Sequence, residues 1–228
     1  MRIKIILEGL RTLLILGRVS NLPTVWSNLL AGWVIADGPW GGLMRRDYNG
    51  PDDTPGPISF VLLGGSFLYI GGMYLNDYCD AAFDARYCPG RPIPAGKISR
   101  RTVGLLSTLW FIAGYACFTS FGPITVLITL LLTAAIVLYD FHHKNVAWAP
   151  LLMGACRCLL YLLAASSVRE SFYFSNDDGY WLGHSLAYLL NDSWYIVRAI
   201  FLSILPAAIP LGLYIACLLY TSDAADEL

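Results

Sequence analysis

Long apolar stretches, separated by short polar segments, recur along the whole chain. A helix that spans a bilayer needs about 20 mostly apolar residues. Six stretches come close to that length: residues 13–36, 58–76, 102–121, 124–139, 147–168 and 195–219. The fourth is the shortest, and only Gly122-Pro123 separates it from the third. Since 57% of the residues are hydrophobic, the pattern predicts an all-α, polytopic transmembrane helix bundle with six spans.

The basic residues between these stretches lie mainly on one side of the predicted membrane. With a cytoplasmic N-terminus, the cytoplasmic segments carry nine: Arg2, Lys4, Arg11, Arg86, Arg91, Lys97, Arg100, Arg101 and Lys144. The opposite side carries three: Arg45, Arg46 and Arg169. Because cytoplasmic loops are enriched in Lys and Arg, we expect this orientation in a bacterial cell membrane or an organellar equivalent. Membrane lipid is therefore an expected partner. Nucleic acid is not, because the basic residues are local and lie on one side of the membrane rather than forming a soluble basic face.

An acidic cluster follows the second apolar stretch directly. Residues 76–84 read NDYCDAAFD, and if the helix continues, Asn76, Asp80 and Asp84 fall within one stripe because residues four apart lie on the same face. Carboxylates spaced in this way repel one another unless a cation binds between them. Mg²⁺ suits such oxygen ligands, so we predict Asn76, Asp80 and Asp84 as metal ligands and Asp77 as a neighbour that orients them.

Basic residues in a turn-rich segment come next. Arg86 is followed by Pro89-Gly90-Arg91-Pro92-Ile93-Pro94-Ala95-Gly96-Lys97, and then by Arg100 and Arg101. Proline and glycine end helices and shape tight loops. Carboxylates beside such a group of cations indicate a metal ion together with a phosphate group, with Arg86 and Arg91 as candidate ligands of the anion.

The two motifs together resemble the UbiA-type membrane prenyltransferases. The resemblance rests on the N-x-x-x-D-x-x-x-D pattern of residues 76–84 and the R-P-x-x-x-G pattern of residues 91–96. It implies Mg²⁺-dependent transfer of a prenyl group from an isoprenyl diphosphate to an aromatic or other lipophilic acceptor, with Asp77, Asp80 and Asp84 as catalytic residues. It also implies about nine spans of bilayer length, of which six are expected here.

The resemblance suggests further substrate-binding residues. Arg18 and Asn21 match the polar start of the family's first helix, although Arg18 could instead extend to the membrane interface. Tyr139 and Lys144 loosely match a loop that grips the diphosphate. Arg157 lies within the fifth span, where an arginine is costly unless it has a function; it could hold an anion or a polar acceptor, or pair with Asp140.

Other side chains could shape or complete the cavity. Five aromatic residues could shelter a carbocation, or only pack or face lipid: Trp26, Trp33, Phe67, Tyr74 and Trp110. Pro23 is expected to kink the first span, and Asn28 could hydrogen-bond to a neighbouring helix.

Two other classes of membrane protein remain as alternatives. A CDP-alcohol phosphotransferase also uses Mg²⁺ and aspartates, but residues 77–86 lack its glycine and the expected later aspartates are missing. A transporter could use an intramembrane acidic site, but no internal repeat supports this class.

The C-terminal residues differ in character from the rest. Residues 220–228, YTSDAADEL, are mostly polar, and with the residues just before them they resemble the translation of a sequencing adapter. We therefore expect a transmembrane domain over 1–219 that is C-terminally truncated, followed by a disordered tail over 220–228. A second aspartate-rich motif implied by the resemblance is missing, so we expect the chain as written to be inactive.

Overall fold

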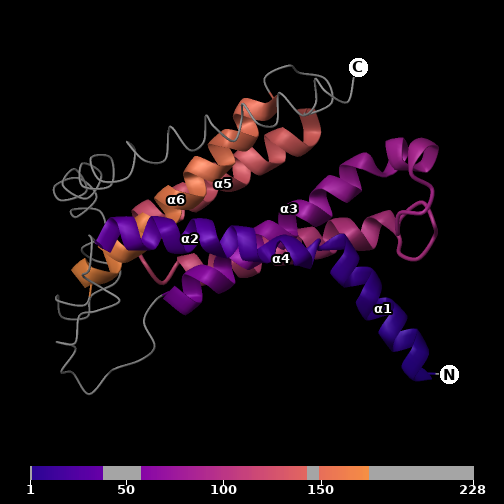
Figure 1. Cartoon of the computed structure of the whole chain (residues 1–228), viewed down its shortest axis with the longest axis horizontal. Coiled ribbons are helices and arrows are strands. Elements are labelled where there is room, and N and C mark those ends of the chain that lie inside the picture. The colour runs from indigo at the N-terminus through magenta and orange to yellow at the C-terminus, as the bar shows by residue number, and fades with distance from the viewer. Residues whose placement is uncertain (1, 38–57, 143–148, 175–228) are drawn as a thin grey trace.

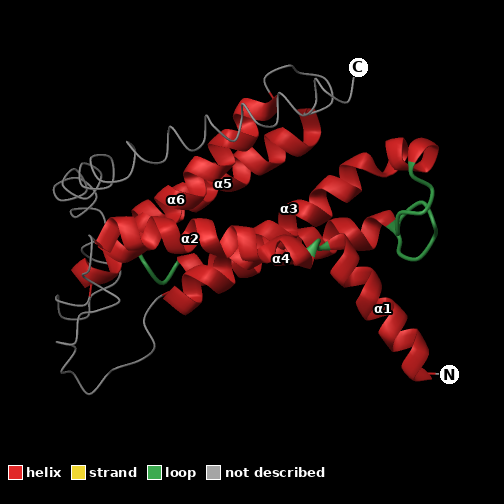
Figure 2. Cartoon of the chain, viewed as in Figure 1, coloured by secondary structure: helices red, strands yellow, loops and turns green. Residues whose placement is uncertain are grey.

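The computed structural model describes residues 2–37, 58–142 and 149–174, and this part of the chain is helical, without strands (Figures 1 and 2). Its elements are α1 (Arg2–Leu16), the short 3-10 helix η1 (Val19–Asn21), α2 (Leu22–Asp37), α3 (Ile58–Tyr87), α4 (Arg100–Phe118), α5 (Pro123–His142) and α6 (Ala149–Phe174). The predicted sixth span and the tail lie outside the described residues, so both expectations remain predictions.

Four of these helices are long and apolar enough to cross a membrane: Ile58–Tyr87, Arg100–Phe118, Pro123–His142 and Ala149–Ser167. They match the second to fifth predicted spans. The division at Gly122-Pro123 is confirmed, because α4 ends at Phe118 and α5 begins at Pro123. Proline is well suited to a first helical position, since its missing N–H would have no partner there.

The predicted first span, residues 13–36, is not one helix. The chain breaks between α1 and α2, where Arg18 adopts a left-handed conformation with φ 43°. The expected kink at Pro23 is wrong, because Pro23 lies in the first turn of α2, where proline removes no helical hydrogen bond. Helix α2 has 16 residues, about 24 Å at the usual rise, and α1 departs from the bundle (Figure 1).

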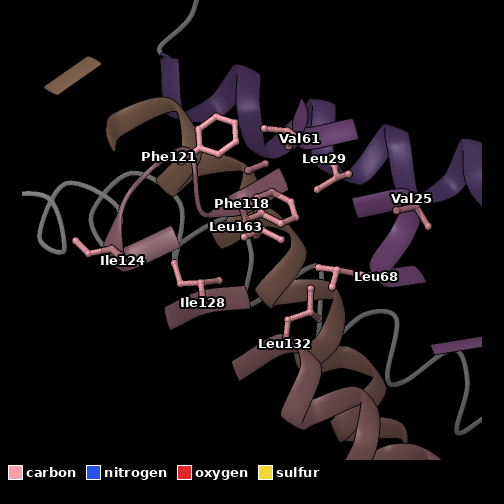
Figure 3. Close-up of a cluster of buried hydrophobic side chains, with 11 residues drawn as sticks. Val25, Leu29, Val61, Leu68, Phe118, Phe121, Ile124, Ile128, Leu132 and Leu163 are labelled. Carbon is pink, nitrogen blue, oxygen red and sulfur yellow. The ribbon is translucent and has the colours of Figure 1, made fainter. Parts of the chain in front are cut away.

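Two groups of helices make most of the contacts in the bundle. Helix α3 packs chiefly on α4, while α2 and α5 both pack on α6, and α2 and α5 also touch α3. Buried side chains from all of these helices meet in one cluster (Figure 3). Its members are Val25, Leu29, Val61, Leu68, Phe118, Phe121, Ile124, Ile128, Leu132, Leu163 and Ala164. In a bilayer such packing acts through close van der Waals contact, because lipid tails are as apolar as these side chains.

Polar side chains tie the helices together inside the bundle. Tyr161 donates to Asn28 Oδ1 at 3.0 Å, which confirms that Asn28 bonds to a neighbouring helix. Trp26 donates to the Ser66 hydroxyl at 2.8 Å, and Ser107 donates to the carbonyl of Gly71 at 2.8 Å. Such bonds contribute modestly, about 0.6 kcal/mol each on average in membranes, but they set the register between helices.

Helices α2 and α6 approach very closely at a glycine. A Cβ on Gly32 would lie 2.7 Å from the backbone oxygen of Tyr161, and backbone cannot move aside as a flexible side chain can. We expect Gly32→Ala to destabilise the protein by about 1–3 kcal/mol, the usual cost of overpacking, and to lower the midpoint of thermal unfolding in detergent followed by tryptophan fluorescence.

Gly9 in α1 provides a matched control, because nothing lies within 4 Å of the position that a Cβ would take there. Gly9→Ala should leave stability unchanged or raise it slightly, since alanine favours helix. Equal unfolding midpoints for the two variants would contradict the close contact between α2 and α6.

Candidate active site

Helix α3 runs uninterrupted through the acidic motif and ends at Tyr87. Its 30 residues measure about 45 Å, more than the roughly 30 Å hydrocarbon core, so the last turns extend toward the membrane interface. The predicted continuation of the helix is confirmed, and Asn76, Asp80 and Asp84 share one stripe. Asn76 and Asp84 are only 8% and 3% exposed, so polar partners must satisfy them inside the protein.

The loop after α3 folds back onto this motif. Gly96 adopts φ 69° within it, a conformation that favours glycine. Arg91 Nη1 donates to Asp84 Oδ2 at 2.8 Å and lies 3.6 Å from Asp77 Oδ1. Burial lowers the pKa of Arg91, but the hydrogen bond and charge of Asp84 outweigh this effect and raise the pKa above its ordinary value. The guanidinium is therefore a permanent cation beside the acidic stripe.

A second arginine reaches the motif from the break between α1 and α2. Arg18 Nη2 donates to Asn76 Oδ1 at 3.2 Å and to Asp77 Oδ1 at 3.4 Å. Its left-handed backbone is a strained conformation for a non-glycine residue, and these contacts compensate for that strain. Asp77 Oδ1 therefore lies within ion-pair distance of both arginines.

A cavity of about 650 Å³ opens beside these groups, between α2, α3, α5 and α6. Its polar lining residues are Arg18, Asn21, Asn76, Asp80, Arg91, Tyr139, Asp140 and Arg157. Apolar side chains such as Leu68, Met73, Leu132 and Ile136 form much of the remaining wall. The cavity is large enough for part of a lipid-like ligand, with charged groups gathered among apolar surroundings.

Most of the predicted site residues meet in this cavity, with three exceptions among those that the structure describes. Asp77 and Asp84 are not among its lining residues and face the two arginines instead. Arg86 is exposed in the last turn of α3 and does not line the cavity either. Lys144 lies outside the described residues.

Arg157 lines the same cavity from α6. The suggested pairing with Asp140 is not found, since no carboxylate among the described residues lies within ion-pair distance of Arg157. Arg18 and Arg91 both have carboxylate partners. Arg157 is therefore the lining arginine that is available to a polar or anionic ligand.

Asp140 also lines the cavity, although the sequence suggested it only as a partner for Arg157. It is 4% exposed and lies on α5, where its Oδ1 accepts from Asn76 Nδ2 at 3.4 Å. Its Oδ2 is buried and has no hydrogen-bond partner among the described residues. Its position offered a signal: like the cluster at 76–84, Tyr139-Asp140 directly follows a long apolar stretch.

The aromatic residues that line the cavity are not those that the sequence suggested. The lining residues do not include Trp26, Trp33, Phe67, Tyr74 or Trp110. Phe67 and Trp110 stack on each other with ring centroids 5.3 Å apart, and Tyr74 donates to the carbonyl of Leu13 at 3.0 Å. Tyr69 and Tyr139 are the aromatic residues that line the cavity. The five expected aromatic residues therefore fit the other alternative, packing or contact with lipid, better.

The oxygen groups of the cavity suit a hard cation. Within the described ranges, no group of three or more His, Cys, Asp and Glu side chains is arranged as a metal cage. The lining nevertheless offers two carboxylates, Asp80 and Asp140, and the amide of Asn76. Mg²⁺ is commonly held by one or two carboxylates together with phosphate oxygens and water, so the residues present fit a cation bound jointly with a diphosphate.

Comparisons with known proteins point the same way. The chain is 25% identical over 138 residues to the 4-hydroxybenzoate octaprenyltransferase of Aeromonas hydrophila, covering 60% of this chain and 44% of that protein. It is 31% identical over 91 residues to the digeranylgeranylglyceryl phosphate synthase of Methanopyrus kandleri, covering 38% of this chain and 34% of that protein. The chain thus spans less than half the length of these relatives.

The fold also matches a solved structure. A structure from work on digeranylgeranylglyceryl phosphate synthase in membranes superposes with a TM-score of 0.59 at 18% identity, over 91% of this chain and 79% of that chain. The UbiA prenyltransferase family matches residues 40–227 of the sequence. These findings favour a prenyltransferase over the phosphotransferase and transporter alternatives. Since the match includes most of the residues, the chain belongs to the UbiA prenyltransferase family and is a multi-pass integral membrane protein.

Proposed function

We propose that this protein transfers a prenyl group from an allylic isoprenyl diphosphate to an aromatic or other lipophilic acceptor, with Mg²⁺ as cofactor. The observation that carries the proposal is one cavity that combines the Asn76 and Asp80 side of the acidic stripe with three arginines, inside an apolar helix bundle. Those are the groups that a metal-bound diphosphate and its hydrocarbon chain require. The predicted orientation would place this end of the cavity on the cytoplasmic side.

The acidic stripe is proposed to hold the cation. Asn76 and Asp80 already line the cavity, and Asp84 lies one turn further along the same face, bound to Arg91. When bound there, Mg²⁺ would withdraw charge from the diphosphate and so weaken the allylic C–O bond. Asp77, held between two arginines, is proposed to orient the stripe.

Arg91 and Arg18 are proposed to receive the departing diphosphate. Both arginine side chains are about two-fifths exposed, at 38% and 39%, although each touches a buried carboxylate. A diphosphate carries more charge than one aspartate, so binding can draw these arginines from Asp84 and Asp77 onto the ligand. Arg86 and Lys144 keep their implied roles in phosphate binding only as predictions.

The remaining walls would shelter the prenyl cation and the acceptor. The rings of Tyr69 and Tyr139 line the cavity, and aromatic faces attract positive charge. The apolar part of the lining would limit the access of water, which could otherwise capture the cation. Asn21 and Arg157, which line the same cavity, supply polar groups that can bind the acceptor.

The function is tested with the purified chain in lipid nanodiscs. Labelled geranyl, farnesyl and geranylgeranyl diphosphates are supplied with Mg²⁺ and a panel of phenolic and quinone-precursor acceptors. The expected result is a labelled, extractable product and released diphosphate, both lost when EDTA is added. Binding of geranyl thiolodiphosphate, an analogue whose bond to the prenyl group does not ionise, is measured in parallel by calorimetry.

Each outcome has a distinct meaning. Product formation supports the function and contradicts the expectation that this chain is inactive. Metal-dependent analogue binding without product fits both the proposed substrate and that expectation. Absence of both analogue binding and product would contradict the proposed function.

A further inference from the structure

Asp140 differs from the neighbouring buried aspartates in how its charge is compensated. Asp84 accepts a 2.8 Å hydrogen bond from Arg91, and Asp77 lies within 3.6 Å of both arginines. Asp140 is buried to a similar degree, yet it has no ion-pair partner among the described residues and only one long hydrogen bond, 3.4 Å from Asn76. A buried carboxylate left in this condition is costly, so it requires an explanation.

The position of Asp140 indicates what it could bind. Its unpartnered Oδ2 belongs to a residue that lines the cavity from α5, opposite the stripe on α3. Asp80 lines the same cavity, so two carboxylates share one partly apolar cavity. Two anions in such a space repel each other, and a cation between them relieves both the repulsion and the desolvation.

The hydrogen bond from Asn76 links the two walls. Arg18 donates to Asn76 Oδ1, so the amide nitrogen faces away from that cation and donates to Asp140 Oδ1. The reverse amide orientation would place two donors face to face. This arrangement holds Asp140 beside the first residue of the acidic stripe and leaves Oδ2 without a hydrogen-bond partner among the described residues.

We propose that Asp140 is an additional oxygen ligand of the divalent cation, supplied by α5 and acting together with Asp80 of α3. This inference rests on the proposed function. The chain would supply two carboxylates, and diphosphate and water would fill the remaining positions, as Mg²⁺ prefers. Asp140 thereby connects α5 to the cation site of α3.

The inference is tested by metal binding rather than by turnover. Mn²⁺, a spectroscopic substitute for Mg²⁺, is titrated into the nanodisc-bound protein with and without geranyl thiolodiphosphate, and free Mn²⁺ is followed by electron paramagnetic resonance. Asp140→Asn should weaken Mn²⁺ binding about tenfold or more, because ligand charge governs the affinity of such sites. Glu8→Gln, an equal charge change at an exposed residue of α1, should not.

A second variant distinguishes the loss of a metal ligand from misfolding of Asp140→Asn. Asp140→Glu keeps the charge but moves the oxygens by one methylene, and should also change Mn²⁺ affinity because the preferred geometry is strict. Unchanged Mn²⁺ affinity in both Asp140 variants overturns the inference, even if acceptor binding is weakened. Unchanged Mn²⁺ affinity in the variants of a protein that binds Mn²⁺ and the analogue overturns the inference alone. Failure of the wild-type protein to bind Mn²⁺ or the analogue overturns the proposed function as well.

Discussion

Asp80→Asn is expected to reduce Mg²⁺-dependent prenyl transfer at least about a hundredfold, the scale seen when one electrostatic group is removed from an active site. Within the described part of α3, Asp80 is the acidic residue that lines the cavity. Asparagine keeps the shape of the side chain but removes the charge that would hold the cation. The measurement is turnover at saturating prenyl diphosphate, or analogue binding with Mg²⁺ where turnover is absent.

Membrane insertion and folding should survive this change. Asp80 is only partly buried, and removing one of several neighbouring carboxylates reduces their mutual repulsion. Glu8→Gln serves as the control for a general loss of negative charge. Full activity of Asp80→Asn at saturating substrate would show that the stripe does not hold the cation.

Arg91→Ala is expected to weaken binding of geranyl thiolodiphosphate about ten- to a hundredfold, since a hydrogen bond to a charged group is worth about 1.5–3 kcal/mol. Arg91 combines a cavity position with direct contacts to Asp84 and Asp77. Alanine would also leave Asp84 without this partner. Arg91→Lys, which keeps the charge but loses the forked donor geometry, should therefore be measured beside it by calorimetry.

Arg101→Ala is the matched control, because Arg101 is exposed and does not line this cavity. Arg100 is less suitable alone, since it donates to the carbonyl of Tyr78 at 2.9 Å and stacks 4.5 Å from the ring centroid of that residue. The double change at Arg100 and Arg101 should still leave diphosphate affinity near wild type. Equal losses in Arg91→Ala and Arg101→Ala would mean that the loop acts only as a general positive field.

Local patterns were sufficient for much of the fold. The lengths of the apolar stretches predicted four helices that the structure contains, because the bilayer restricts spanning segments to a narrow range of length and composition. The first predicted span failed for a physical reason. Hydropathy cannot reveal a backbone break at Arg18, where contacts with Asn76 and Asp77, far away in the sequence, hold a strained conformation.

By itself, the sequence determined the helical class, the continuation of α3 through the acidic stripe and the basic loop after it, because each of these depends on neighbours within a few residues. Only the tertiary structure decided which side chains share the cavity. It turned Asp84 and Asp77 toward Arg91 and Arg18, and brought Asp140 and Arg157 to the same space. Those placements depend on how α2, α3, α5 and α6 pack. Asn76 and Asp140 are far apart in the sequence, and they come into contact only because α3 and α5 pack together.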